Sequence, residues 1–289
     1  MMSRLAGKVA VITGGASGMG KATVMRFLSE GASVMVGDIN ADNLEVLSAE
    51  IAHKGGSERL RTIEADVSQE DDISAMFAGA TAAFGKLDIV FNNAGIGGAI
   101  GPITELDVEH WDFTFAILTR SVFLGTKHAA RIMIEQGHGG AIVNTASIAG
   151  MGAGNGPTAY SAAKSAVISL TQNAALELAP HHIRVNCICP GMIFTPLMHR
   201  GDEERAEQSM RHVQPWPERG EGEHIANAAL YLAEDTSDFV TGQVHVIDGG
   251  YLANGRIAGT AVAGVSGRFV GVTYGTTGKA PEVRKVDPS

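Results

Sequence analysis

The sequence predicts a single α/β domain built on a doubly wound, seven-stranded parallel sheet with helices on both faces. Short apolar runs of strand length alternate along most of the chain with longer amphipathic segments of helix length, and this alternation is typical of a parallel sheet. Each run is mostly apolar, as strands buried on both faces should be. With 289 residues and 45% apolar content, the chain can bury one large core.

The predicted strands occupy residues 9–13, 33–38, 60–65, 87–92, 141–146, 183–188 and 244–247. The predicted helices occupy residues 18–30, 41–54, 69–84, 107–136, 157–179 and 222–233. The helix at 157–179 starts with Pro157, which suits a first helical turn. Right-handed crossovers are expected to place helices on both faces of the sheet. The domain is predicted to cover residues 1–250, followed by an extension over 251–289.

The first crossover contains a glycine-rich segment, Thr-Gly-Gly-Ala-Ser-Gly-Met-Gly at residues 13–20. Glycine lets the backbone turn sharply and approach a pyrophosphate, and the free N–H groups at the start of a helix attract its charge. The segment therefore predicts a dinucleotide site that includes Gly14, Ser17, Gly18, Met19 and Gly20. A simple tight turn is the alternative.

Asp38 ends the second predicted strand, about twenty residues beyond the glycine-rich segment. A carboxylate there can accept hydrogen bonds from the adenosine ribose and repels a 2′-phosphate. Ile39 and Asn40 follow it, rather than Arg or Lys, so NAD is favoured over NADP. The alternative is that Asp38 is only a helix N-cap.

Tyr160 and Lys164 are four residues apart in a predicted helix, so their side chains share one face. A fixed positive charge about 4 Å from a phenol, in a surface-like dielectric, lowers its pKa by up to roughly three units. Tyr160 is therefore expected to exchange protons near neutral pH. Ser147, at the end of a neighbouring strand, is expected to donate a hydrogen bond to a substrate oxygen where charge develops. By itself Ser147 would fit a strand-end cap.

Further motifs follow in order: Asp66-Val67, Asn92-Asn93-Ala94-Gly95, Ser147 thirteen residues before Tyr160, and Pro190-Gly191 with Thr195 after it. With them, residues 6 to about 250 resemble the short-chain dehydrogenases/reductases, in the subgroup with Thr-Gly-x-x-x-Gly-x-Gly and Tyr-x-x-x-Lys motifs. The resemblance implies a Rossmann-type fold with NAD as cofactor. It implies further cofactor contacts from Ile39, Asp66, Val67, Asn93, Ala94, Gly95, Tyr160, Lys164, Pro190, Gly191, Ile193 and Thr195.

The predicted reaction interconverts a secondary alcohol and its ketone. Tyr160 would exchange the proton on oxygen, Lys164 would lower the pKa of Tyr160, and the hydride would pass directly between the substrate carbon and the nicotinamide. The alternative is an NAD-binding protein of the same fold with weak or absent chemistry and a role in sensing or assembly.

One position departs from the family pattern. An Asn is usual in the fourth helix, where its backbone carbonyl holds a water that links the lysine to solvent. Here Leu118 occupies that place, and no Asn lies between Asn93 and Asn144. Because a main-chain group holds the water, a leucine is expected to preserve the kinked helix and the proton relay. A slower enzyme or another proton route is the alternative.

The segment 192–219 is predicted to form a lid over the site. Apolar side chains there and after the catalytic serine predict a hydrophobic substrate, such as a cyclic, aromatic or steroid-like alcohol. The predicted substrate contacts are Ile148, Met151, Met192, Met198 and Trp216. The methionines could instead be mere gap-fillers. The charged run at residues 202–205 is expected to be a solvated helix face. The histidines lack metal-ligand spacing, so no metal is expected.

Charge and hydropathy indicate the expected partners and cellular location of the protein. The formal net charge is −9, with 31 acidic and 22 basic residues, and the basic residues do not cluster in the sequence. This pattern argues against a surface that binds nucleic acid or a membrane. Small molecules are therefore the expected partners. No apolar stretch approaches the length of a membrane span or a signal peptide, so a cytoplasmic protein is expected. Cys187 and Cys189 alternate along a predicted strand and are expected to be buried, reduced thiols.

The extension at 251–289 is rich in small residues. Segments 260–265 and 268–274 have strand-like composition separated by glycine, so they are expected to pair as a hairpin or pack on another subunit. Residues 279–289 are expected to be disordered. An arm that embraces an oligomer is the favoured interpretation, and a loosely ordered tail is the alternative. Small residues in the helix at 157–179 also favour a homodimer or homotetramer, as is common in the family.

Overall fold

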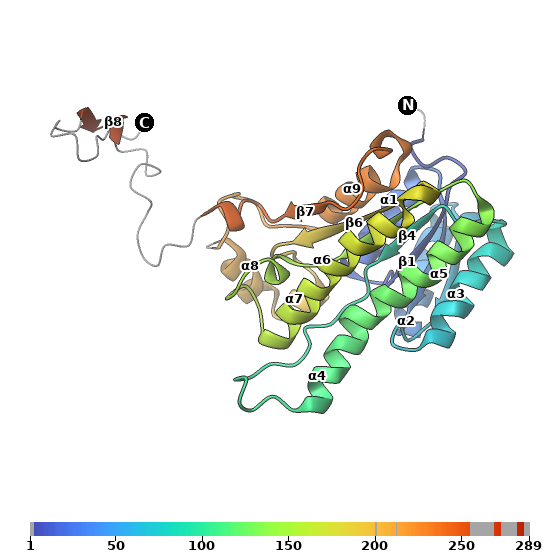
Figure 1. Ribbon diagram of the computed structural model, residues 1–289, viewed down its shortest axis with the longest axis horizontal. Coiled ribbons are helices and arrows are strands. Elements are labelled where there is room, and N and C mark those ends of the chain that lie inside the picture. The colour runs from blue at the N-terminus through green and yellow to red at the C-terminus, as the bar shows by residue number, and fades with distance from the viewer. Residues whose placement is uncertain (1–2, 200, 212, 255–268, 273–281, 286–289) are drawn as a thin grey trace.

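The computed structural model describes residues 3–199, 201–211, 213–254, 269–272 and 282–285. At its centre lies a seven-stranded sheet in the order β3-β2-β1-β4-β5-β6-β7, with every neighbouring pair parallel (Figure 1). The strands are β1 (Val9–Thr13), β2 (Ser33–Asp38), β3 (Leu60–Glu64), β4 (Ile89–Asn92), β5 (Gly140–Thr145), β6 (Ile183–Pro190) and β7 (Val244–Ile247). The predicted fold class is confirmed.

The larger helices cover both faces of the sheet (Figure 1). One face carries α1 (Gly18–Ser29), α2 (Ala41–His53) and α9 (Gly222–Ala233), and α1 packs directly against α9. The opposite face carries α3 (Glu70–Phe84), α5 (Ser121–Gln136) and α6 (Thr158–Leu178). Each face has its own apolar core, and each fully buried large side chain there contributes about 1.5–3 kcal/mol to stability.

The last strand connection differs from the predicted right-handed crossover. The connections β4 to β5 and β5 to β6 run through helices on the α5 and α6 face. The connection β6 to β7 moves in the same direction across the sheet but runs through α9, on the opposite face. It is therefore left-handed. The reason is packing: buried residues of α9, including Ile225 and Leu230, complete the core against α1.

The single helix predicted over 107–136 is interrupted by a π-helical stretch. α4 (Val108–Phe115) leads into the π segment η2 (Ala116–Arg120), and α5 follows without a break. At the end of this stretch the hydroxyl of Ser121, the first residue of α5, donates a 2.5 Å hydrogen bond to the Ile117 carbonyl. The hydroxyl compensates for a loosened helical turn, and π segments of this kind occur frequently at functional sites.

The segment between β6 and α9, called the lid after the sequence prediction, contains α7 (Pro196–His199) and α8 (Glu203–Arg211). Asp202 caps α8, since its carboxylate accepts the Arg205 backbone N–H at 3.1 Å. A parallel bridge between Ile193 and Gly220 joins the two stems of the lid.

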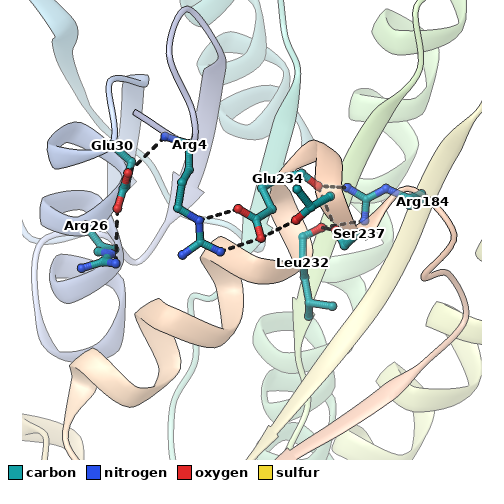
Figure 2. A network of polar contacts seen from close by, with 8 residues as sticks. Arg4, Arg26, Glu30, Arg184, Leu232, Glu234 and Ser237 are labelled. Atoms are coloured by element: carbon teal, nitrogen blue, oxygen red, sulfur yellow. Dashed lines mark hydrogen bonds and ion pairs between the residues drawn. The ribbon is translucent and has the colours of Figure 1, made fainter. Parts of the chain in front are cut away.

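A polar network ties the start of the chain to the end of α9 (Figure 2). The Arg4 guanidinium binds both carboxylate oxygens of Glu234, and the Arg4 backbone N–H donates to Glu30. Arg184 of β6 donates to the carbonyls of Leu232 and Glu234, at 2.7 and 3.1 Å. The end of α9 is thereby held between the N-terminal segment and β6.

In the extension, the described residues form a 3₁₀ helix, η6 (Leu252–Asn254), and an antiparallel pair, β8 (Phe269–Val272) with β9 (Glu282–Lys285). The expectation of disorder over 279–289 is therefore wrong for residues 282–285, which take a strand conformation by pairing with β8. The predicted strand at 260–265 lies outside the described residues. No helix in the described part of the chain is long and apolar enough to cross a membrane. Cys187 and Cys189 are buried free thiols, as predicted.

Candidate active site

The glycine-rich segment links β1 to α1 at the carboxyl edge of the sheet. Gly14 and Gly18 have φ of +62° and +50°, in the left-handed region that favours glycine. A Cβ on Gly14 would lie 2.7 Å from the Ala94 Cα, and one on Gly20 would lie 2.0 Å from the Gly14 carbonyl oxygen. The loop can therefore bring bare backbone and the start of α1 close to a phosphate.

Asp38 holds this loop in place. Its carboxylate accepts the Ala16 N–H at 3.0 Å and the Asn40 N–H at 3.1 Å. The N-cap of α2 is Asn40, whose side chain accepts the Asn43 N–H. The alternative role of Asp38 as the helix cap is therefore excluded.

Asn93, after β4, fastens the loop from the other side. Its amide donates to the carbonyls of Thr13 and Gly14, each at 3.1 Å. The Thr13 hydroxyl in turn accepts the backbone N–H groups of Asn93 and Ala94. The predicted cofactor residue Asn93 thus also shapes the phosphate loop.

The smaller of the two site cavities, about 280 Å³, runs along this edge of the sheet. Most of the predicted cofactor residues line it: Gly14, Ser17, Gly18, Met19, Asp38, Ile39, Asp66, Val67, Asn93, Ala94, Gly95, Tyr160, Lys164 and Thr195. Gly20 is absent from this lining, because it packs beneath the loop. Pro190, Gly191 and Ile193 line the neighbouring larger cavity instead.

Ser147, Tyr160 and Lys164 come together where the two cavities meet. Ser147 follows β5, and its hydroxyl accepts the Ala149 N–H and lies beside the Tyr160 phenol. Lys164 follows Tyr160 by one turn of α6, and its Nζ lies 5.8 Å from the centre of the tyrosine ring. That ammonium is buried and donates a 2.6 Å hydrogen bond to the Thr145 carbonyl. Tyr160 lines both cavities.

Burial dominates the protonation of this group. It raises the pKa of Tyr160 above its ordinary value, although the hydrogen bond from Ser147 acts in the opposite direction. Burial also lowers the pKa of Lys164 to about 8. Burial, rather than the charge of Lys164, sets the direction of the Tyr160 pKa shift in this structure, and the expected lowering by Lys164 stays a prediction. It assumed a surface-like dielectric, whereas both groups are withdrawn from water and the ammonium faces a carbonyl.

The larger cavity, about 720 Å³, lies on the Ser147 side of Tyr160. The predicted substrate residues Ile148, Met192 and Met198 line it. Met151 does not; its side chain is exposed. Trp216 lines a separate cavity of about 200 Å³ near β7. These two predictions are corrected: both side chains follow the right motifs in sequence but turn away from this cavity.

The charged run at residues 202–205 is exposed at all four positions, as predicted. Two of these residues, Asp202 and Arg205, also line the larger cavity. The acidic capping residue and the arginine one turn later share one side of α8.

Comparison with known proteins identifies the family. The family model described as "Enoyl-(Acyl carrier protein) reductase" matches residues 14–252. A curated 3beta-hydroxysteroid dehydrogenase 2 of Eggerthella lenta is 42% identical over 252 residues, covering 86% of this chain and 96% of the relative. The chain belongs to the short-chain dehydrogenase/reductase family. The family uses nicotinamide cofactors, and the named relatives are oxidoreductases.

Solved structures agree with this assignment. The crystal structure of levodione reductase superposes with a TM-score of 0.81 at 36% identity, covering 86% of this chain and 99% of that one. A short-chain type dehydrogenase/reductase from Mycobacterium marinum gives a TM-score of 0.78 at 35% identity, with 86% and 97% coverage. The similarity spans nearly the whole length of both short-chain dehydrogenase/reductase structures.

Leu118, which departs from the usual family asparagine, lies within the π segment. Its side chain is fully buried and lines the smaller cavity beside Lys164. A Cβ on Gly95 would approach it to 3.3 Å, so the leucine packs against the loop after β4. The Thr119 hydroxyl donates to the Ala163 carbonyl at 3.1 Å and ties the π segment to α6. The expected distortion of this helix is thus present with a leucine.

Sequence reasoning missed several residues at the site of this short-chain dehydrogenase/reductase. Phe113, Ile117 and Thr145 line the smaller cavity, and His199 and Tyr251 line the larger one. Thr145 had a usable signal, because it ends β5 two residues before Ser147. The others belong to a helix or to the segments around the lid, and their orientation depends on tertiary packing.

Proposed function

We propose that the protein is an NAD-dependent oxidoreductase that interconverts a cyclic secondary alcohol with a hydrophobic body and the corresponding ketone. The observation that carries the proposal is the position of Tyr160, whose side chain lines both the cofactor cavity and the larger cavity. A single phenol can therefore meet a substrate oxygen while the reacting carbon faces the nicotinamide.

The residues present fit a dinucleotide. Bare glycine backbone and the start of α1 face the smaller cavity, and Ser17, the N-cap residue of α1, makes no capping bond through its side chain among the described residues. Asp38 lies in the same cavity, where its charge opposes a 2′-phosphate and favours NAD. When bound, the nicotinamide supplies the acceptor or donor of hydride.

The protein side of the chemistry is proton transfer. Tyr160 would give its phenolic proton to the carbonyl oxygen in ketone reduction, and would take it back in alcohol oxidation. Ser147 would donate a hydrogen bond to the same oxygen as negative charge develops. Lys164, held by the Thr145 carbonyl, would orient the nicotinamide ribose.

Because the pKa of Tyr160 is raised, ketone reduction and alcohol oxidation are expected to have different pH optima. Reduction uses the protonated phenol, which dominates at neutral pH. Oxidation uses the phenolate, so its kcat/KM should rise as the pH approaches the phenol pKa from below.

Three further arguments support a hydrophobic substrate that contains a ring. Ile148, Met192 and Met198 give the larger cavity apolar walls. The relatives named above, a hydroxysteroid dehydrogenase and levodione reductase, are named for ring-containing substrates. A cavity of about 720 Å³ also accommodates a compound larger than a short-chain alcohol.

The test measures NADH consumption and formation with a panel of cyclic ketones and alcohols, cyclohexanone and a 3β-hydroxysteroid included. Tyr160→Phe should lower kcat by roughly 10²–10⁴-fold while the dissociation constant of NADH, followed by fluorescence, stays unchanged. Binding of NADH without turnover of any compound would contradict the proposal and favour a sensing or assembly role. Higher kcat/KM with NADP than with NAD would contradict the cofactor assignment.

A further inference from the structure

The wall that the lid helix α8 gives to the larger cavity is polar. Asp202, Arg205, Ala206 and Ser209 line the cavity and are spaced i, i+3, i+4 and i+7, so they form one stripe along the helix. A helix that covers a wholly apolar ligand is expected to present an apolar stripe. In this stripe only Ala206 is apolar.

The other charged or titratable groups on this wall have structural partners. The Asp202 carboxylate accepts the Arg205 backbone N–H and so caps α8. His199 accepts the Gly201 N–H at 3.1 Å through Nδ1, and its ring stacks on Phe194 with centroids 5.0 Å apart. Both side chains are thus used to hold the lid together.

Arg205 differs from them. Among the residues that the structure describes, its guanidinium makes no hydrogen bond and no ion pair. Arg219, also in the lid, pairs with Glu221 at 2.5 Å and with Glu207 at 3.4 Å. Arg205 therefore stands at the solvent-exposed side of the larger cavity as a cation without a protein partner among the described residues, although α8 also carries Glu203, Glu204 and Glu207.

The same cavity has a reacting end. Ser147 and Tyr160 line it, and Ile148, Met192 and Met198 are among the apolar side chains of its lining. A ligand that fills it meets proton-transfer groups, an apolar wall and a guanidinium. Such a ligand has a ketone or alcohol, a hydrophobic body and an anionic group.

We propose that the substrate carries a carboxylate remote from its reacting carbon and that Arg205 binds this carboxylate. The planar guanidinium matches a carboxylate with two parallel N–H···O bonds, which gives orientation as well as affinity. The inference rests on the proposed function, because it deepens the substrate class of the same site.

The first test compares matched substrates: 4-oxocyclohexanecarboxylate with its methyl ester, and an oxosteroid carboxylate with its methyl ester. For at least one pair, the wild-type kcat/KM should be about 10-fold or more higher for the acid, since a charge-assisted hydrogen bond is worth about that factor or more. Equal values, or a preference for both esters, would overturn the inference.

The second test uses variants. Arg205→Ala should raise KM for the preferred acid about 10- to 100-fold, with a smaller change in kcat and an unchanged KM for the ester. Arg205→Lys should retain part of the preference. Arg131→Ala on α5 is the charge-matched control away from the site, and Glu203→Ala controls for disturbance of α8; both should leave the acid preference intact.

A binding measurement separates this inference from the proposed function. Calorimetry with NADH present should detect binding of the preferred acid to the Tyr160→Phe variant. The affinity for this acid should drop in the double variant that also carries Arg205→Ala. If no compound is turned over but the acid binds through Arg205, the proposed reaction fails and the carboxylate site stands. Turnover of neutral ketones without Arg205-dependent binding of either acid overturns the carboxylate site alone.

Discussion

The Arg219 guanidinium lies over the ring of Phe194, 3.8 Å from the ring centre. The two residues belong to opposite stems of the lid, and the Phe194 N–H also donates to the Gly220 carbonyl at 2.7 Å. This contact joins the two stems of the lid, whose residues Met198 and Arg205 line the larger cavity.

Loss of this contact should loosen the lid. Arg219→Ala and Phe194→Leu are each expected to raise KM several-fold, because a partly desolvated cation–π contact is worth about 1–2 kcal/mol. In a double-mutant cycle on kcat/KM, the effects should be non-additive by about 1 kcal/mol. Strict additivity would show that the two side chains do not act together.

Asp38 should control cofactor choice and loop geometry separately. Asp38→Asn removes the charge and keeps an oxygen that can accept the Ala16 N–H. It is expected to lower the KM for NADP while the KM for NAD rises only a few-fold. Asp38→Ala also loses the bond to the loop and should weaken both cofactors. Steady-state kinetics with NAD and NADP check this, and identical behaviour of the two variants would contradict the loop-holding role.

Lys164 should leave a signature in the pH dependence of stability. Burial lowers its pKa to about 8 in the folded protein, against an ordinary value of 10.5 for a lysine in an unfolded chain. Between these values the unfolded state binds more protons, so the lysine makes the free energy of unfolding rise with pH. Lys164→Met should lack this rise. The check is urea unfolding of both proteins across this range; parallel curves would contradict a depressed lysine pKa. The variant should also lose turnover.

Glu234 should stabilise the protein through Arg4. Arg4, hydrogen-bonded to the carboxylate, holds the pKa of Glu234 below its ordinary value. The stabilisation is therefore present above pH 4.5 and disappears as the pH falls through the lower folded value. Glu234→Gln should lower the free energy of unfolding by about 1–2 kcal/mol at pH 7, with little difference from wild type in strong acid. Urea unfolding at both pH values is the measurement.

The sequence predicts the strands and the cofactor loop well because their physical causes are local. Buried parallel strands require continuous apolar runs, and the bounds of β1, β2 and β7 match residue for residue. The glycines at 14 and 18 have backbone conformations for which glycine is suited. These features need no knowledge of distant parts of the chain.

Other properties depend on packing that the sequence does not display. The charged run at 202–205 has an ordinary surface composition, yet Arg205 faces the cavity because of how α8 is placed. The pKa of Tyr160 depends on burial beside the sheet rather than on its spacing from Lys164. The hand of the last crossover follows from the fit of α9 against α1.

That left-handed connection has a consequence for how such enzymes diversify. Because α9 lies on the face opposite α6, the chain that leaves β6 has to pass over the carboxyl edge of the sheet before it reaches α9. The lid residues, which line the larger cavity, belong to this connecting segment. Insertions and exchanges within it can reshape the pocket without touching a strand register, so the topology separates what the enzyme recognises from what keeps it folded.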